Sequence, residues 1–457
     1  MKNKILLLFP DGVGIRNYLY SDVFETKNDE VVLFHNFDDT TIKKITEITS
    51  IKESSKIPKY NETVKEKFFR ELICLSRLKS NAKLTKNKSI LTNWKTNHKN
   101  LKNKLFYKLV EFSAKFISTY NQIESLEKRF QKELRKTDYY KEIKSVLENI
   151  KPTLLFCSHQ RGLQCATIFA AANDLKIKTT TVIYSWDNLP KARLALRADK
   201  YLVWSDNMKE EMKMYYPEIN QNKVIVTGTP QFECYDKKEN CIPKEQFYKE
   251  YDLDVSKKII CFSGDDVLTS PDDPKYLNDL VVELIENKLD NDYQILFRRC
   301  PVDISGRYEE VVKKYPKLIK EAPPIWNFEK GSSWTTIYPL REDIKLLVST
   351  AFYCDVVVNV GSTMAFDFAM FQKPCIFINY DQKVKENPNW SVKTIYQFQH
   401  FKSMPNKDAV LWWNEKGMIT ELLKQSFNTQ AMNHWKERIL STSQKNTSTA
   451  IRKSLNL

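Results

Sequence analysis

The chain of 457 residues is 42% hydrophobic and 28% charged, with a formal net charge of +15. This length suits two large hydrophobic cores rather than one, and the composition is typical of a globular protein. It contains no run of the roughly 18 apolar residues that span a membrane. Its nine cysteines and five histidines form no metal-binding pattern, so we predict reduced thiols, a cytoplasmic protein and no metal.

The first domain is predicted to cover residues 1–230 and to begin with a short apolar strand. The basic start resembles a signal peptide, but the apolar run is short and Asp11 follows it at once. The strands predicted for the first sheet are Ile5–Phe9, Glu30–Phe34, Leu154–Cys157, Thr179–Tyr184 and Tyr201–Trp204. Residues 58–149 have a helical pattern and form an insertion between these strands.

The insertion is strongly basic, with no acidic residue from Leu72 to Val110. Its basic residues are Arg77, Lys79, Lys83, Lys86, Lys88, Lys95, Lys99, Lys102, Lys104 and Lys108. One interpretation is a solvated helical face. The other is a platform from Lys79 to Lys108 for an anionic membrane surface or a phosphate-bearing acceptor. Aromatic residues are few and no recognition motif is present, so no nucleic-acid partner is predicted.

A charged linker is predicted at residues 231–258, followed by a second domain at 259–415 and C-terminal helices at 416–457. The second sheet is predicted to contain Ile259–Phe262, Gln294–Phe297, Asp355–Val360 and Cys375–Ile378. Five of the apolar runs end in glycine. Unalternating apolar strands joined by helices indicate parallel sheets whose ligands lie at the strands' carboxyl ends. The predicted fold class is α/β, with two Rossmann-like domains facing each other across a cleft.

The most specific segment runs from Asp355 to Asp381 and has the pattern strand, glycine turn, helix, strand. Gly361, Ser362 and Thr363 form the turn, and the N-terminus of a helix attracts phosphate. Asp367 lies one helical turn beyond Thr363, where its carboxylate can accept both hydroxyls of a ribose. The alternative is that Ser362 only caps the helix and Asp367 is solvated.

This Gly-Ser-Thr segment, with its acidic residue and the following Lys-Pro and strand, resembles the donor-binding region of GT-B glycosyltransferases. It also resembles the related CDP-glycerol glycerophosphotransferases and non-hydrolysing UDP-N-acetylglucosamine 2-epimerases. The resemblance implies that Gly361, Ser362 and Thr363 bind the donor diphosphate and that Asp367 binds the ribose. It further implies chemistry without a metal or any cofactor other than the nucleotide-sugar donor.

A second resemblance lies in the first domain. Tyr184–Pro190, Ala198–Ser205 and Val224–Phe232 look like a bacterial surface-polysaccharide group of the same superfamily. In that group a histidine after the last strand faces the donor, which makes His400 a further donor-binding candidate. Its alternative is a structural histidine.

Arg298 and Arg299 end a predicted strand, where guanidinium groups can neutralise a leaving diphosphate. Their alternative is a surface ion pair with Asp303 or Glu309. An inverting transfer needs a base, and the candidates at strand ends are Asp187, His159 and Asp11. For each candidate the alternative is a local role in a turn, the core or a helix cap. Arg16 and Asn17 open the first helix and are predicted to contact an acidic acceptor.

The sequence therefore predicts transfer of a sugar from a nucleotide-sugar to a polysaccharide or lipid-linked acceptor, with inversion, either in the cytoplasm or at the inner face of the membrane. The nearest alternative is glycerophosphate transfer from CDP-glycerol. A 2-epimerase fits less well because its small soluble substrate makes no use of the basic insertion. A non-catalytic anion- or lipid-binding protein is the alternative from another class.

Overall fold

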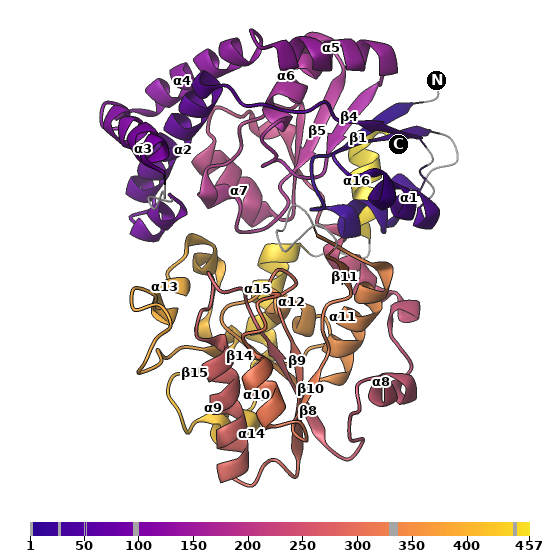
Figure 1. Cartoon of the computed structure of the whole chain (residues 1–457), viewed down its shortest axis with the longest axis vertical. Helices are drawn as coiled ribbons and strands as arrows, with labels where there is room; N and C mark the ends of the chain where they lie inside the picture. Colours follow the sequence, from indigo (N-terminus) through magenta and orange to yellow (C-terminus); the bar gives the residue numbers. More distant parts are fainter. Residues whose placement is uncertain are drawn as a thin grey trace. The chain divides into compact units, whose positions relative to one another are not determined.

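The computed structural model describes residues 3–25, 29–49, 51, 53–94, 100–328, 337–441 and 446–457. The chain forms two compact units (Figure 1). Unit 1 contains Met1–Pro230 and Ile439–Leu457, and unit 2 contains Gln231–Arg438. No helix in the described part combines the length and the apolarity needed to cross a bilayer.

Unit 1 is built on a parallel sheet in the order β3-β2-β1-β4-β5-β6-β7. Its strands are β1 (Lys4–Phe9), β2 (Glu30–His35), β3 (Glu53–Lys56), β4 (Leu154–Cys157), β5 (Lys178–Val182), β6 (Lys200–Val203) and β7 (Val224–Val226). Ile5 pairs with Val31 of β2 on one side and Leu154 of β4 on the other. The strand order reverses between β1 and β4, and parallel sheets bind their ligands at the carboxyl ends of the strands at such a point.

Burial on both faces explains why these strands lack alternation, since Ile5 to Phe9 are all fully buried. The unit's helices outside the insertion are α1 (Asp39–Ile48), α6 (Cys165–Asp174), α7 (Asp206–Tyr215) and α16 (Thr447–Leu455). Sequence analysis did not place β3 or β7 in the sheet. The edge strand β3 has the sequence Glu-Ser-Ser-Lys and is largely exposed, so it carries no apolar signal.

The insertion is helical, as predicted, and comprises α2 (Val64–Leu84), η3 (Lys88–Asn93), α3 (Leu101–Ser113), α4 (Tyr120–Leu134) and α5 (Asp138–Ile150). Thr63 and Glu66 form a capping box that starts α2. Arg77 of α2 is 1% exposed; it pairs with Glu127 of α4 and donates to the Tyr215 carbonyl at 2.7 Å. Arg77 therefore connects two helices of the insertion to the chain beside the sheet.

Unit 2 contains a second parallel sheet in the order β10-β9-β8-β13-β14-β15. Its strands are β8 (Lys258–Ser263), β9 (Tyr293–Arg298), β10 (Ile319–Glu321), β13 (Val356–Asn359), β14 (Cys375–Ile378) and β15 (Leu411–Trp413), and β11 (Trp326–Asn327) pairs separately with β12 (Tyr338–Pro339). Its helices are α8 (Lys244–Glu250), α9 (Asp273–Glu286), α10 (Glu309–Lys314), α11 (Arg341–Tyr353), α12 (Met364–Ala369), α13 (Val392–Ile395), α14 (Ile419–Lys424) and most of α15 (Thr429–Leu440). The order reverses between β8 and β13. Two parallel sheets confirm the predicted α/β class of two Rossmann-like domains.

The boundaries between the units differ in detail from the predicted segments. Residues 231–258, predicted as a linker, contain η6 (Pro230–Asp236), η7 (Lys238–Asn240) and α8, and they belong to unit 2. The predicted C-terminal helices at 416–457 divide between the units. The last of them, α16, returns to unit 1, where Arg452 donates to the Val23 carbonyl at 3.0 Å.

Candidate functional site

In unit 1, two of the predicted bases meet at the point where the strand order reverses. Asp11 follows β1 and His159 follows β4, and His159 Nδ1 lies 2.8 Å from Asp11 Oδ2. When the ring proton is on Nδ1, this nitrogen donates to Asp11 Oδ2 and Nε2 is the basic nitrogen of the ring. This arrangement of a base and the group that orients it is found in general-base catalysis.

The surrounding loops hold this pair in place. Asp11 Oδ1 accepts the backbone N–H of Val13 at 3.0 Å. Gly14 has φ 98°, and a Cβ on it would lie 2.8 Å from Ser158 Cβ, so the loops after β1 and β4 touch where only glycine fits. The Tyr184 ring packs edge-on against His159 with centroids 5.9 Å apart.

The third candidate, Asp187, is part of a local network after β5. It accepts from Asn188 Nδ2 at 2.9 Å and forms an ion pair with Lys191. Gln160, the residue after His159, donates to Asn188 Oδ1 at 2.9 Å, so this network contacts the loop of the Asp11–His159 pair. The structure thus brings Asp187 into the same region but ties its carboxylate to neighbours in sequence.

The predicted acceptor contacts lie on η1 (Ile15–Leu19), a single π-helical turn that follows Gly14. Asn17 is buried, and its Nδ2 has no hydrogen-bond partner within the described ranges. Arg16 is half-buried, and its Nε donates to Asn17 Oδ1 at 3.4 Å. The two residues therefore interact with each other, with Asn17 turned into the protein.

In unit 2, the predicted donor turn follows β13 at the other reversal of strand order. Gly361 has φ +67°, and a Cβ on it would lie 2.8 Å from Phe401 Cζ. Asn359 Oδ1 accepts the N–H of Ser362 at 2.8 Å, and Ser362 Oγ accepts the N–H of Met364 at 3.3 Å. Ser362 Oγ therefore binds the N–H of the first residue of α12, and Thr363 is the N-cap of this helix.

Asp367, the predicted ribose ligand, lies on α12 and is 4% exposed. Its Oδ1 accepts a 2.6 Å hydrogen bond from the hydroxyl of Tyr235, which comes from η6. The Tyr235 hydroxyl thus donates to one carboxylate oxygen of Asp367, which is the hydrogen bond predicted for a ribose hydroxyl. Sequence analysis missed Tyr235 because it lies 132 positions away, in the segment predicted as a linker.

His400 lies on η8 (Gln399–Ser403), close to the donor turn. Its ring centroid is 4.4 Å from that of Phe401. Phe401 is also the side chain that covers Gly361, so the histidine and the glycine turn share a neighbour.

The two arginines at the end of β9 are bound by the protein itself. Arg298 is buried; its Nη2 contacts both oxygens of Asp343 at 2.8 and 3.0 Å, while Nη1 has no partner among the described residues. Arg299 Nη1 donates to the Asp303 carbonyl at 2.9 Å. The ion-pair partner of Arg298 is thus on α11, and Asp303 pairs instead with Arg307.

A cluster of side chains that could bind a metal lies after the end of β8. It contains Asp265, Asp266 and Cys300, whose ligand atoms are all within 4.8 Å of one another. Burial and the neighbouring Asp273 and Asp266 raise the pKa of Asp265 well above its usual value. Asp266 Oδ1 accepts the N–H groups of Leu268 and Thr269.

Comparison with known proteins supports the fold. No family model matches the chain. It is 25% identical over 191 residues to the teichoic acid poly(ribitol-phosphate) polymerase of Bacillus spizizenii, covering 40% of this chain but 26% of that protein. The chain thus spans about a quarter of the length of this curated relative.

Similar solved structures cover nearly the whole chain. The MnaA–UDP complex of S. aureus has a TM-score of 0.52 at 12% identity and covers 100% of this chain and 98% of its own. The UDP-GlcNAc 2-epimerase of Neisseria meningitidis bound to UDP-GlcNAc has a TM-score of 0.54 at 11% identity and covers 99% of both chains. The chain therefore has the GT-B fold, as the sequence predicted.

We expect Gly361→Ala to destabilise unit 2 more than Gly417→Ala. Both glycines have positive φ, but a Cβ on Gly417 meets nothing within 4 Å, whereas one on Gly361 meets Phe401. Gly417→Ala should lower the free energy of unfolding by about 1–2 kcal/mol, the cost of a left-handed backbone in alanine. Gly361→Ala should lower it further, because its Cβ must also displace the Phe401 ring. Equal free energies of unfolding by urea denaturation would contradict the tight turn.

Proposed function

We propose that the chain is a glycosyltransferase that moves a sugar from a nucleotide-sugar to a polysaccharide or lipid-linked acceptor with inversion. The observation that carries this proposal is the Asp11–His159 pair at the reversal of strand order in unit 1. It supplies a basic nitrogen on a GT-B fold, at the kind of edge where such sheets bind ligands.

In the proposed reaction, His159 accepts the proton of the acceptor hydroxyl through Nε2. The acceptor oxygen then forms a bond to the anomeric carbon of the donor sugar. The bond from that carbon to the diphosphate breaks, and the nucleoside diphosphate leaves with the electron pair. Asp11 keeps the Nδ1 proton in place and stabilises the imidazolium that forms.

The nucleotide is assigned to unit 2. Gly361, Ser362 and Thr363 are proposed to bind the diphosphate and Asp367 the ribose, with His400 nearby. Arg298 retains an amino group without a partner among the described residues, and with Arg299 it is proposed to stabilise the leaving diphosphate. The S. aureus and N. meningitidis structures were determined with UDP and UDP-GlcNAc, which supports a uridine nucleotide as the first to test.

The second candidate is transfer of a polyol phosphate, such as glycerophosphate from CDP-glycerol. It is favoured by the match to a poly(ribitol-phosphate) polymerase. Both reactions deprotonate an acceptor hydroxyl, so the residues of unit 1 serve either one. The nucleotide that binds to unit 2 separates them.

Nucleotide binding tests this assignment. We expect one of UDP, GDP, CDP, CMP and dTDP to raise the melting temperature, and Thr363→Ala and Asp367→Ala to weaken its binding by about 1–3 kcal/mol for each lost hydrogen bond. Tyr235→Phe is the matched control, because it removes the protein partner of Asp367 but leaves the carboxylate. Calorimetry that gives both Thr363→Ala and Asp367→Ala the affinity of the wild type and of Tyr235→Phe would remove the donor site from this turn.

Turnover tests the base. With saturating donor, His159→Ala should lower kcat by about 10²–10⁴-fold. Asp11→Asn should also lower kcat, because the amide that replaces the carboxylate does not hold His159 in the tautomer with its proton on Nδ1. Asp187→Asn should stay within about tenfold of wild type, well short of that loss, since Asp187 is already paired with Lys191. A collapse of Asp187→Asn alone would instead make Asp187 the base.

An anionic membrane surface is proposed as a partner of the insertion. The helix α3 exposes an apolar stripe, defined by Leu101, Leu105, Leu109 and Phe112, whose exposed fractions are 80%, 70%, 53% and 57%. Phe116 extends the stripe and packs edge-on against Phe112. The opposite face of α3 is held in a buried cluster by Val110, so the stripe faces away from the core.

Lysines border this stripe. Lys104 and Lys108 lie three positions after Leu101 and Leu105, on the adjoining strip of the same helix, and both are exposed. Lys83, Lys86 and Lys88 of the same insertion are exposed as well, while Lys95 and Lys99 lie outside the described residues. An apolar face bordered by lysines matches the boundary of an anionic bilayer, where apolar side chains enter and ammonium groups meet phosphates.

Vesicle flotation tests this proposal. The chain should bind vesicles containing phosphatidylglycerol but not pure phosphatidylcholine. Reversing Lys83, Lys86 and Lys88 to Glu should weaken binding at least about 100-fold, since each lysine near the surface contributes about 1 kcal/mol. The double variant Leu105→Gln, Phe112→Gln should also release the protein from the vesicles. The control is Val64→Gln, which should not, because Val64 is 75% exposed but lies outside the stripe. If vesicle binding were unchanged by Leu105→Gln with Phe112→Gln and by added salt, the proposal that α3 contacts an anionic bilayer would be contradicted.

A further inference from the structure

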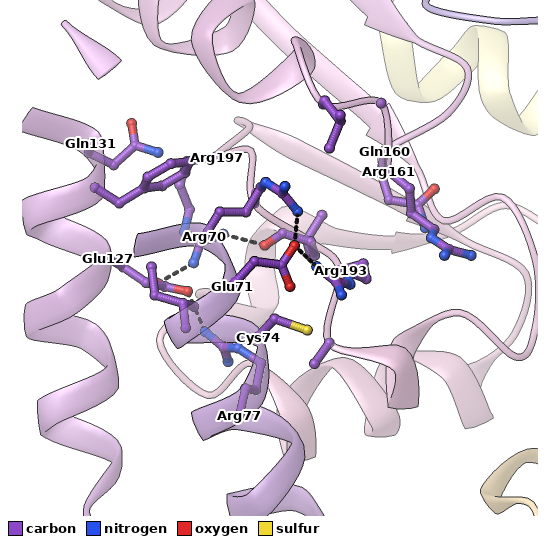
Figure 2. Close-up of a pocket in the computed structure, with 17 residues that line it drawn as sticks. Arg70, Glu71, Cys74, Arg77, Glu127, Gln131, Gln160, Arg161, Arg193 and Arg197 are labelled. Carbon is purple, nitrogen blue, oxygen red and sulfur yellow. Dashed lines mark hydrogen bonds and ion pairs between the residues drawn. The ribbon is translucent and has the colours of Figure 1, made fainter. Parts of the chain in front are cut away.

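Unit 1 contains a pocket of about 290 Å³ in which the proposed reaction places no group. It lies among α2, α4, the loop at residues 160–163 and the loop at residues 192–197 (Figure 2). The charged side chains that line it are Arg70, Glu71, Arg77, Glu127, Arg161, Arg193 and Arg197. Lysine supplies most of the positive charge of the insertion, but every cation in this pocket is an arginine, the residue best suited to hold an anion through two parallel hydrogen bonds.

Four of the five arginines are neutralised by glutamates. Arg70 pairs with Glu62 and Glu71, and Arg193 donates to Glu71 at 2.9 Å. Arg77 and Arg197 share the remaining two glutamates, which are Glu127 and Glu218. Figure 2 shows Arg70 and Arg193 joined to Glu71 by dashed lines. These ion pairs connect the side chains that form the wall of the pocket.

Arg161 is the fifth arginine, and it differs from the others. It is exposed at the pocket and makes no hydrogen bond or ion pair with any described residue. Desolvation lowers the pKa of Arg161, while Asp187 offsets this only in part. For Arg70, Arg77 and Arg197, desolvation acts in the same direction but the glutamates outweigh it and raise the pKa. The pocket therefore holds one positive charge that lacks a counterion.

The pocket also holds an acceptor without a donor. Glu71 is 3% exposed, and its Oε2 has no hydrogen-bond partner in the described part of the chain. Burial alone would raise the pKa of Glu71, but Arg193 and Arg70 lower it below its usual value, so the group is a carboxylate. A buried carboxylate oxygen without a donor is costly, and a hydroxyl group of a ligand would satisfy it.

The position of the pocket connects it to the Asp11–His159 pair. Gln160 and Arg161 line the pocket and directly follow His159 in the loop after β4. Gln160 is fixed by two hydrogen bonds, because its Oε1 accepts the N–H of Tyr184 at 3.2 Å and its Nε2 donates to Asn188. A ligand bound to Arg161 is thus held by the loop that carries the proposed base.

We infer that this pocket binds the acidic part of the acceptor, namely an anionic group with a hydroxyl beside it, as in a sugar acid or a polyol phosphate. Arg161 holds the anion, and Glu71 accepts a hydrogen bond from the hydroxyl. The inference rests on the proposed transfer, since it names the chemistry of the acceptor for that reaction. It uses residues of unit 1 alone and is separate from the donor turn.

Titration calorimetry of the full chain tests the pocket with glycerol 1-phosphate, D-glucuronate, inorganic phosphate and glycerol. One of the first two should bind, and which one binds distinguishes a polyol phosphate from a sugar acid. Inorganic phosphate and glycerol should bind at least about tenfold more weakly, because each lacks one of the two recognised groups. Inorganic phosphate that binds as tightly as glycerol 1-phosphate would overturn the role of Glu71.

The matched variants are Arg161→Gln and Arg129→Gln, since both arginines are exposed and neither forms a described ion pair. Arg161→Gln should weaken binding of the bound probe at least about tenfold, the loss of one charge-assisted hydrogen bond, and Arg161→Lys should recover part of it. Arg129→Gln should leave it unchanged. Wild-type affinity in Arg161→Gln, or no binding of any probe at millimolar concentration, would overturn the inference. Binding of UDP, GDP, CDP, CMP and dTDP to the wild type is measured in parallel, because failure of all five to bind would count against the proposed donor and not against this pocket.

Discussion

Parallel pairing of the strands is the constraint on which the rest of the structure depends. In a parallel sheet every carboxyl end lies on the same edge, so loops that are far apart in sequence meet there. The order of each sheet reverses once about its first strand, between β1 and β4 in unit 1 and between β8 and β13 in unit 2. That geometry brings Asp11 next to His159, although 148 positions separate them. It also places the Gly361 turn beside the end of β8.

The insertion depends on a different interaction, the buried network around Arg77. Arg77 and Arg197 lie between Glu127 and Glu218, with further hydrogen bonds to Tyr120 and backbone carbonyls. Burying such charges costs several kcal/mol for each ion, which is recovered only when every partner is present. The network therefore specifies one position for α2 and α4 against the sheet. Without that position the arginine-lined pocket would have no wall.

Two of the proposed roles of unit 1 depend on different faces of the same insertion. The buried face of α2 supplies the walls of the pocket, and the loop after β4 supplies its uncompensated cation. The outer face of α3 supplies the apolar stripe with its lysines. An enzyme that modifies an acidic, lipid-linked acceptor has a use for both surfaces, because the lipid must stay in the bilayer while the acidic head reaches the base. The proposals are connected, yet each depends on its own residues.

The sequence by itself determined the fold class and most of the buried strands, because strands covered on both faces must be continuously apolar. It also marked the turns after β1 and β13, since a chain with nine glycines uses them where positive φ or close contact requires it. It offered Asp187 and His159, ahead of Asp11, as alternative bases. The tertiary structure alone decided that Asp11 contacts His159, that Tyr235 donates to Asp367 and that Arg298 pairs with Asp343. Edge strands such as β3, and an uncompensated arginine such as Arg161, carry no local pattern. Their properties depend on which distant groups surround them, and packing fixes those neighbours.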